Sequence, residues 1–184
     1  KELEDAGADA LELNVYYIAG DPNMSGEQVE NRYLQLLADL REHITIPVTM
    51  KLSSQFSSVA NMVLKLQQAG AKGVSLFNRF YQPSIDLETL TISPELNLSS
   101  SADSLVAMRW IAILYGRSSL SLGATGGVHT AEDAIKLLLA GADVVHLCSL
   151  LLEQGPRAVT PLLRGIETWS EEQGFESIDE VRGR

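Results

Sequence analysis

Three polar residues close three apolar strands that the sequence predicts, and their types suit the binding of a polar ring. Asn14 and Asn78 end the first and third strands, and Lys51 ends the second. A carboxamide offers both donors and an acceptor, which matches the edge of a heterocyclic ring. A lysine ammonium can stabilise negative charge that develops during a reaction. The alternatives are that the asparagines only form turns and that the lysine is solvated.

A glycine turn adds a candidate anion site. Thr125-Gly126-Gly127 follows an apolar run, and a glycine has no side chain to block a close backbone approach. The N–H groups of both glycines could face one anion together with those of Cys148 and Ser149, at the end of the next strand. In a parallel barrel, the loops after the last two strands form a phosphate site at this place. A tight turn without a ligand is the alternative.

Two tyrosines and two histidines lie near these positions. Tyr16 and Tyr17 follow Asn14, and one of them could act as a general acid or base, although an unperturbed phenol is a poor base at neutral pH. Packing under the loop that follows is the alternative role. His129 adjoins the glycine turn and could touch a ligand, whereas His146 lies within a strand and is expected in the core. The sequence holds no metal-ligand spacing and no Ser-His-Asp pattern that can be placed.

Short apolar strands alternate with amphipathic helices and must position these residues. Strands are expected over Ala10–Val15, Pro47–Leu52, Gly73–Asn78, Ser119–Ala124 and Asp143–Cys148. Helices are expected over Gly26–His43, Ser58–Ala69, Ala102–Tyr115, Thr130–Ala140 and Pro156–Gln173. A helix end, an Ala-Gly-Ala step and a strand recur together three times along the chain. Such alternation predicts an α/β fold with a parallel sheet covered by helices.

Two α/β folds are compatible with this order, an open doubly wound sheet and part of a (β/α)8 TIM barrel. Polar residues at the carboxyl ends of the strands favour the barrel, whose sites gather at that face. Five strands cannot close an eight-stranded barrel, so residues 1–184 are expected to form a single domain with about the last five βα units. Because Lys1–Gly7 looks like the end of a helix with its glycine cap, we expect the N-terminal part of a larger fold to be missing.

Two loops are long enough to act as lids or binding loops. Tyr16–Ser25 follows the first strand and Arg79–Ser101 follows the third. Within the second loop, Ile85–Ile92 alternates as in a small β-ribbon, which we expect over the mouth of the barrel. Disorder of this segment is the alternative.

Composition restricts the class of partner. The chain carries a formal net charge of −10 at pH 7 and no basic stripe, which argues against nucleic acid or an anionic membrane as its main partner. Cys148 is its one cysteine, so no internal disulfide can form, and a reducing, cytoplasmic location is expected. No apolar run approaches the length of a transmembrane helix, and no signal peptide is visible. A small-molecule substrate is the expected partner, and a homo-oligomer is a further option.

The motifs, taken in order, resemble those of the FMN-dependent dihydroorotate dehydrogenase family, and the likeness covers nearly the whole chain. The motifs are Glu12-Leu13-Asn14, Lys51-Leu52-Ser53, Asn78, Thr125-Gly126-Gly127-Val128, Ala140-Gly141-Ala142-Asp143 and the tail Gly174–Glu180. The resemblance implies a flavoprotein of pyrimidine biosynthesis, built as an FMN-binding (β/α)8 barrel. Such an enzyme would oxidise dihydroorotate, or a similar dihydropyrimidine-like ring, by hydride transfer to the flavin.

The resemblance also implies a role for individual residues. Contacts to FMN would fall on Asn14, Lys51, Thr125, Gly126, Gly127, Cys148 and Ser149, of which the last four would hold its phosphate. Contacts to substrate would fall on Asn14 and Asn78. Apart from the resemblance, the charge of Arg79 could attract an acidic group of the substrate. Lys51 would lie against the pyrimidine side of the isoalloxazine and stabilise the anionic reduced flavin.

Two segments depart from the family pattern. After Glu-Leu-Asn the family usually continues with Leu-Ser, then Cys or Ser, then Pro-Asn, and this loop brings the catalytic base and another substrate asparagine. Here Val15–Pro22 places Tyr17 at the position of the base. The segment Arg79–Pro83 is bulkier than a dihydroorotate pocket would lead one to expect. Two alternatives therefore stay open, a flavin-free barrel lyase or isomerase acting on a phosphorylated metabolite, and a non-catalytic member that binds flavin.

Overall fold

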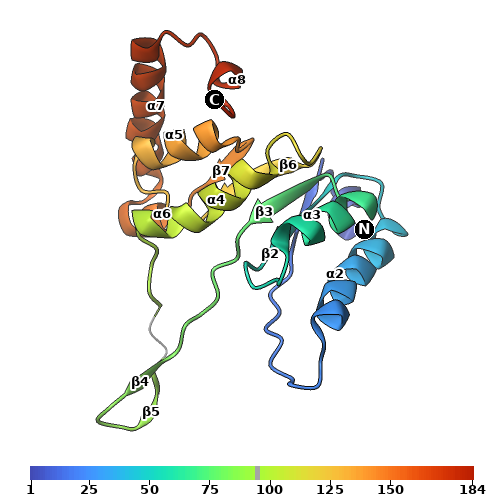
Figure 1. The fold of residues 1–184 in the computed structure, drawn as a ribbon. Helices are drawn as coiled ribbons and strands as arrows, with labels where there is room; N and C mark the ends of the chain where they lie inside the picture. Colours follow the sequence, from blue (N-terminus) through green and yellow to red (C-terminus); the bar gives the residue numbers. More distant parts are fainter. Residues whose placement is uncertain (94–95) are drawn as a thin grey trace.

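The structure is a computed structural model that describes residues 1–93 and 96–184 (Figure 1). Its main sheet contains the strands β1 (Leu11–Asn14), β2 (Val48–Leu52), β3 (Gly73–Leu76), β6 (Ser121–Thr125) and β7 (Val144–His146). The helices are α1 (Glu2–Asp5), α2 (Gly26–Arg41), α3 (Val59–Gln68), α4 (Ser104–Leu114), α5 (Ala131–Ala140), α6 (Ser149–Gln154), α7 (Val159–Gln173) and α8 (Ile178–Val181). Two 3₁₀ turns, η1 (Ser101–Asp103) and η2 (Pro156–Ala158), precede α4 and α7.

The strand order distinguishes between the two candidate folds. The order is β1-β2-β3-β6-β7, and each strand of this sheet pairs in parallel with the sheet strand that follows it in sequence, with β4 and β5 lying outside the sheet. A doubly wound sheet reverses its strand order at a switch point and carries helices on both faces. Here the order does not reverse, and α3, α4 and α5 lie side by side against one face (Figure 1). These are consecutive βα units of a (β/α)8 barrel, which confirms the predicted fold class.

The two faces of the sheet differ in character because side chains alternate along a strand. The face under the helices is apolar and fully buried, with Val48, Met50, Leu52, Val74, Leu76 and Ala124 at 0% exposure. The alternate positions on β1, β2 and β3 are polar, namely Glu12, Asn14, Thr49, Lys51 and Ser75. Burial of the apolar face therefore turns a polar face toward the inside of the barrel.

The predicted helix-end signals are formed. Ser25 caps α2 in a capping box with Gln28, and Thr130 caps α5 in a capping box with Asp133. Gly141 ends α5 in the left-handed conformation, at φ 111°. These local bonds satisfy backbone groups that a helix end leaves without partners, and so they fix where α5 begins and ends beside the glycine turn.

The structure corrects several predicted boundaries. The strand predicted to reach Asn78 ends at Leu76, after which the Asn78 N–H still donates to the Leu52 carbonyl, over 2.7 Å. The strand predicted to end at Ala124 includes Thr125, because Thr125 lies opposite His146 on β7. Two helices, α6 and α8, are missed by the sequence patterns. They have six and four residues, too few to display a helical period.

The predicted ribbon in the long loop after β3 is present. β4 (Ser84–Asp86) and β5 (Thr91–Ser93) pair antiparallel, with Ile85 opposite Ile92. Its large apolar side chains are exposed, and Figure 1 shows it extending away from the main sheet. Neither β4 nor β5 contains a buried residue. The ribbon is therefore not packed over the ends of the strands, where the sequence predicted it.

Candidate functional site

The polar residues at the strand ends line one cavity of about 250 Å³. Tyr17 and His129 are not part of its lining, whereas all the residues predicted to contact FMN or substrate are: Asn14, Lys51, Asn78, Arg79, Thr125, Gly126, Gly127, Cys148 and Ser149. The cavity is also lined by Tyr16, Phe77, Ser99, Val128 and His146. These residues come from segments up to 135 positions apart, between Asn14 and Ser149, and meet because parallel strands share one carboxyl edge.

Lys51 is held on the inner face of the sheet by a carboxylate on the neighbouring strand. Its Nζ lies 3.6 Å from Oε1 of Glu12, and the Ser75 hydroxyl donates to the other oxygen of Glu12. The strand register places Lys51 between Asn14 on β1 and Ser75 on β3. The side chains of Lys51 and Glu12 are only 24% and 33% exposed, so the ammonium has a fixed position at the cavity. Neither Glu12 nor Ser75 is a site residue in the sequence-based prediction.

Asn78 connects the ends of β1 and β3. Its Nδ2 donates to the Val15 carbonyl over 3.1 Å, which fixes the orientation of the amide beside the cavity. Asn14, two positions after Glu12, faces the same side of the sheet. Two amide groups and one ammonium are thus presented together to the cavity.

Tyr17, which the sequence places at the position of the catalytic base, does not line the cavity. Its hydroxyl donates to Sδ of Met24 over 3.2 Å, and the Arg32 guanidinium lies 4.9 Å from the centre of its ring. Tyr16 lines the cavity instead, and its hydroxyl accepts the backbone N–H of Tyr81 over 2.7 Å. Adjacent side chains of an extended segment point to opposite sides, so only one of the two tyrosines can face the cavity.

The two glycines of the turn are required for different reasons. Gly126 has φ 96°, and a Cβ built there would have no heavy atom within 4 Å. Gly127 has φ 74°, but a Cβ there would lie 2.8 Å from the Ser100 carbonyl oxygen and closer still to the Ser104 nitrogen. Gly126 therefore leaves open space at the cavity, whereas Gly127 allows the turn to pack on the start of α4.

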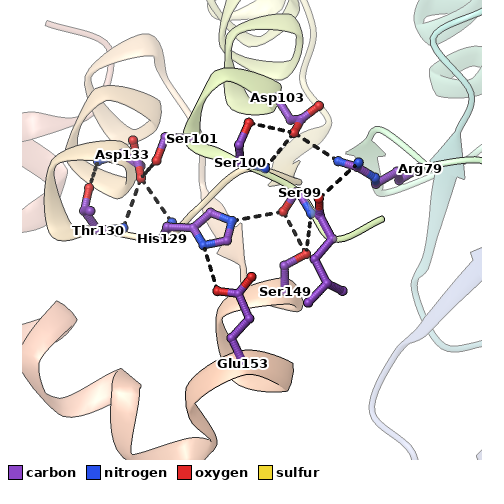
Figure 2. A network of polar contacts seen from close by, with 11 residues as sticks. Arg79, Ser99, Ser100, Ser101, Asp103, His129, Thr130, Asp133, Ser149 and Glu153 are labelled. Atoms are coloured by element: carbon purple, nitrogen blue, oxygen red, sulfur yellow. Dashed lines mark hydrogen bonds and ion pairs between the residues drawn. The ribbon is translucent and has the colours of Figure 1, made fainter. Parts of the chain in front are cut away.

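Figure 2 shows a polar network that connects α6, the loop before η1 and the loop before α5, and two of its residues, Ser99 and Ser149, line the cavity. The N–H and the hydroxyl of Ser99 both donate to Oγ of Ser149, over 2.9 and 2.8 Å. Nε2 of His129 lies 3.1 Å from Oγ of Ser99, and Nδ1 of the same ring lies 3.8 Å from Oε2 of Glu153. Sequence reasoning identified Ser149 and His129 but missed Ser99 and Glu153, which no local pattern marks.

Arg79 is paired within the same region. Its guanidinium lies 3.0 Å from Oδ2 of Asp103 and donates to the Leu98 carbonyl over 3.3 Å. The Ser100 N–H, and after it the Arg79 guanidinium, hold the pKa of Asp103 below its usual range. Arg79 thus connects the loop after β3 to η1, and its side chain remains 44% exposed at the cavity.

Asp133 supports the loop that carries His129. Its carboxylate accepts the Ser101 hydroxyl over 2.8 Å and the backbone N–H groups of His129 and Thr130 over 3.1 and 3.0 Å. Burial acts to raise the pKa of Asp133, but these bonds outweigh it, and the pKa is lowered. An ionised Asp133 therefore joins η1 to the start of α5.

Within residues 1–93 and 96–184, no group of three or more His, Cys, Asp and Glu side chains could hold a metal ion. None of the helices in these ranges is both long enough and apolar enough to cross a membrane.

Comparisons with known proteins agree on one family. A family model described as dihydroorotate dehydrogenase matches residues 2–169. The catalytic subunit of dihydroorotate dehydrogenase B (NAD(+)) from Methanothermobacter thermautotrophicus is 26% identical over 184 residues, covering 96% of this chain and 60% of the relative. The same subunit from Pyrococcus furiosus is 28% identical over 188 residues, covering 100% and 62%. The NAD-dependent dihydropyrimidine dehydrogenase subunit PreA of Escherichia coli is 26% identical over 199 residues, covering 98% and 47%. The chain therefore spans about half to three-fifths of the length of these relatives.

Proposed function

The chain belongs to the dihydroorotate dehydrogenase family, and from this premise we propose that it forms part of an FMN-dependent oxidoreductase. The substrate would be dihydroorotate or a similar dihydropyrimidine-like ring, oxidised by hydride transfer to the flavin. The observation that carries this proposal is the convergence of Asn14, Lys51, Asn78 and Gly126 on one cavity at the carboxyl edge of a parallel sheet. In a barrel of this kind, that edge is where active sites lie.

The residues at the cavity fit the chemistry of FMN. The open space at Gly126 and the hydroxyl of Ser149 lie on the side where a phosphate would be held. The amides of Asn14 and Asn78 suit the alternating donors and acceptors of a heterocycle. Lys51 contributes a positively charged ammonium group to the cavity lining.

Each residue would make a separate contribution to the reaction. When bound, the flavin supplies the acceptor for a hydride. Lys51, fixed by Glu12, places a positive charge where negative charge develops. Asn14 and Asn78 would orient the ring that reacts, which lowers the entropic part of the barrier.

We infer that the substrate would bind beside an aromatic hollow. A hollow of about 230 Å³ is lined in part by Tyr16, Arg79, Phe80 and Tyr81, and it shares Tyr16 and Arg79 with the cavity. The rings of Tyr16 and Phe80 are 4.6 Å apart between centres. Aromatic faces bind planar rings by stacking, and a guanidinium binds a carboxylate. A planar ring that carries an acidic group is therefore the substrate class that this side supports.

We expect Tyr17→Phe to leave the rate of substrate oxidation within about twofold of the unmodified protein, because the hydroxyl donates to Met24 and Tyr17 does not line the cavity. Tyr16→Phe removes the bond to the Tyr81 N–H and is expected to raise KM by about fivefold, through loss of order at the substrate side. Steady-state kinetics of the two variants side by side provide the measurement. A large fall in kcat for Tyr17→Phe alone would restore that tyrosine as the base.

The absorbance spectrum of the purified full-length protein tests the cofactor. We expect the flavin spectrum in the protein as isolated, or after incubation with FMN, and bleaching on addition of a dihydropyrimidine substrate. Protein that stays colourless after incubation with FMN would contradict the proposal and favour a flavin-free lyase or isomerase. Bound flavin that no dihydropyrimidine reduces would favour a non-catalytic member.

A further inference from the structure

The pairing between Lys51 and Glu12 uses charge and not a hydrogen bond. Nζ of Lys51 lies 3.6 Å from Oε1 of Glu12, beyond the range of about 2.7 to 3.2 Å in which an N–H group donates to oxygen. The contact is therefore a Coulomb attraction between two neighbouring strands, β1 and β2. An ammonium has three donor hydrogens, and the pairing leaves all three of them for a ligand in the cavity.

Glu12 is fixed by Ser75 and not by the lysine. The Ser75 hydroxyl donates to Oε2 of Glu12, and Ser75 is only 1% exposed. The strand register places Ser75 between Lys51 on β2 and Gly123 on β6. A Cβ at Gly123 would lie 3.2 Å from Oγ of Ser75, so the glycine leaves room for this hydroxyl. The carboxylate thus has a buried partner of its own, which holds it apart from the ammonium.

The Glu12 carboxylate is not part of the cavity that would hold the ligand. Among the described residues that line this cavity, none is an aspartate or a glutamate. Glu12 lines a second hollow instead, of about 240 Å³, together with Thr49 and Ser75 on the inner face of the sheet. It would therefore act on a ligand through Lys51, whose positive charge it compensates in part.

We propose that Glu12 is a positioning residue that sets the reduction potential of the bound flavin by compensating part of the Lys51 charge, and that Ser75 limits this compensation. The inference rests on the proposed function, since it takes FMN as the ligand. A ring that accepts a hydride gains one negative charge, and a positive charge beside it raises its potential. A carboxylate near that positive charge has the opposite effect. The bond from Ser75 keeps the carboxylate from approaching the ammonium more closely.

The test measures the reduction potential of FMN bound to the intact protein, by equilibrium with a reference dye of known potential, followed by absorbance. This measurement needs neither substrate nor turnover. Glu12→Gln removes the negative charge but keeps the shape of the side chain and an acceptor for Ser75. Ser75→Ala removes the bond that holds the carboxylate, which can then approach the ammonium. Glu30→Gln is the matched control, because it removes the carboxylate that lies 2.7 Å from Lys65 in an ion pair between α2 and α3.

We expect Glu12→Gln to favour the reduced flavin about tenfold more than the unmodified protein does, which is a rise of about 30 mV for a two-electron couple. Ser75→Ala should lower the potential, and Glu30→Gln should leave it unchanged. These opposite shifts distinguish the proposed role from a merely structural one, since a loss of packing at either residue would not change the sign.

An unchanged or lowered potential in Glu12→Gln would overturn the inference and leave the proposed function intact. If Glu12→Gln does not fold, Ser75→Ala decides alone, because an unchanged or raised potential in that variant contradicts the limit set by Ser75. Unmodified protein that binds no FMN would overturn both the inference and the proposed function.

Discussion

Lys51→Ala is expected to slow the oxidation of substrate by at least about 100-fold while FMN stays bound. The Lys51 ammonium lies at the cavity and is held by Glu12, so its charge is in place before the reaction begins. A charge that is already oriented costs no reorganisation when negative charge develops, and loss of such a group typically removes several kcal/mol of stabilisation from the transition state. Single-turnover reduction, followed by flavin absorbance, measures this step apart from product release.

Two control variants separate the charge from the fold. Lys72→Ala removes an exposed lysine from the residue just before β3, and it should leave the rate unchanged. Lys51→Arg keeps the charge but changes its geometry, and it should recover part of the lost rate. If Lys51→Ala reduced the flavin as fast as the unmodified protein, the lysine would have no part in the reaction. If it failed to bind FMN, Lys51 would act in cofactor binding instead.

The strand-end residues could be predicted because a parallel sheet brings distant positions to one edge. Asn14, Lys51 and Asn78 follow recognisable apolar strands, so their proximity follows from the fold class alone. Tyr16 lines the cavity and Tyr17 does not, for a physical reason. Counting alternate residues from Asn14 leads to Tyr16, whereas the family pattern, carried over position by position, led to Tyr17. The local backbone period therefore accounts for which of the two tyrosines lines the cavity.

The polar network could not be predicted from the sequence in the same way. Ser99 and Ser149 are fifty residues apart, and no period or motif connects them. Glu153 lies on α6, which is too short for its apolar residues to display a helical pattern. A partial signal was present, because Ser100 and Asp103 have the spacing of a capping box and form one in the structure. Such a signal marks a turn but not the segment against which the turn packs.

Gly127→Ala is expected to lower the free energy of unfolding by at least about 3 kcal/mol, through two costs that add. The backbone at Gly127 has φ 74°, a conformation that an L-residue adopts only with strain. The added methyl would also collide with the Ser100 carbonyl and the Ser104 nitrogen, which belong to the backbone and cannot move aside as a side chain would. Urea unfolding followed by circular dichroism measures the change.

Gly126→Ala is the matched control for this prediction, because it has the same kind of backbone strain without the collision. Its φ is 96°, and the methyl would enter open space. It should therefore cost only about 1 to 2 kcal/mol of stability. Its effect should appear instead in FMN affinity, since the methyl would project toward the cavity where a ligand is expected. Equal losses of stability in the two variants would mean that the strain at the turn, and not its packing on the start of α4, makes glycine necessary at position 127.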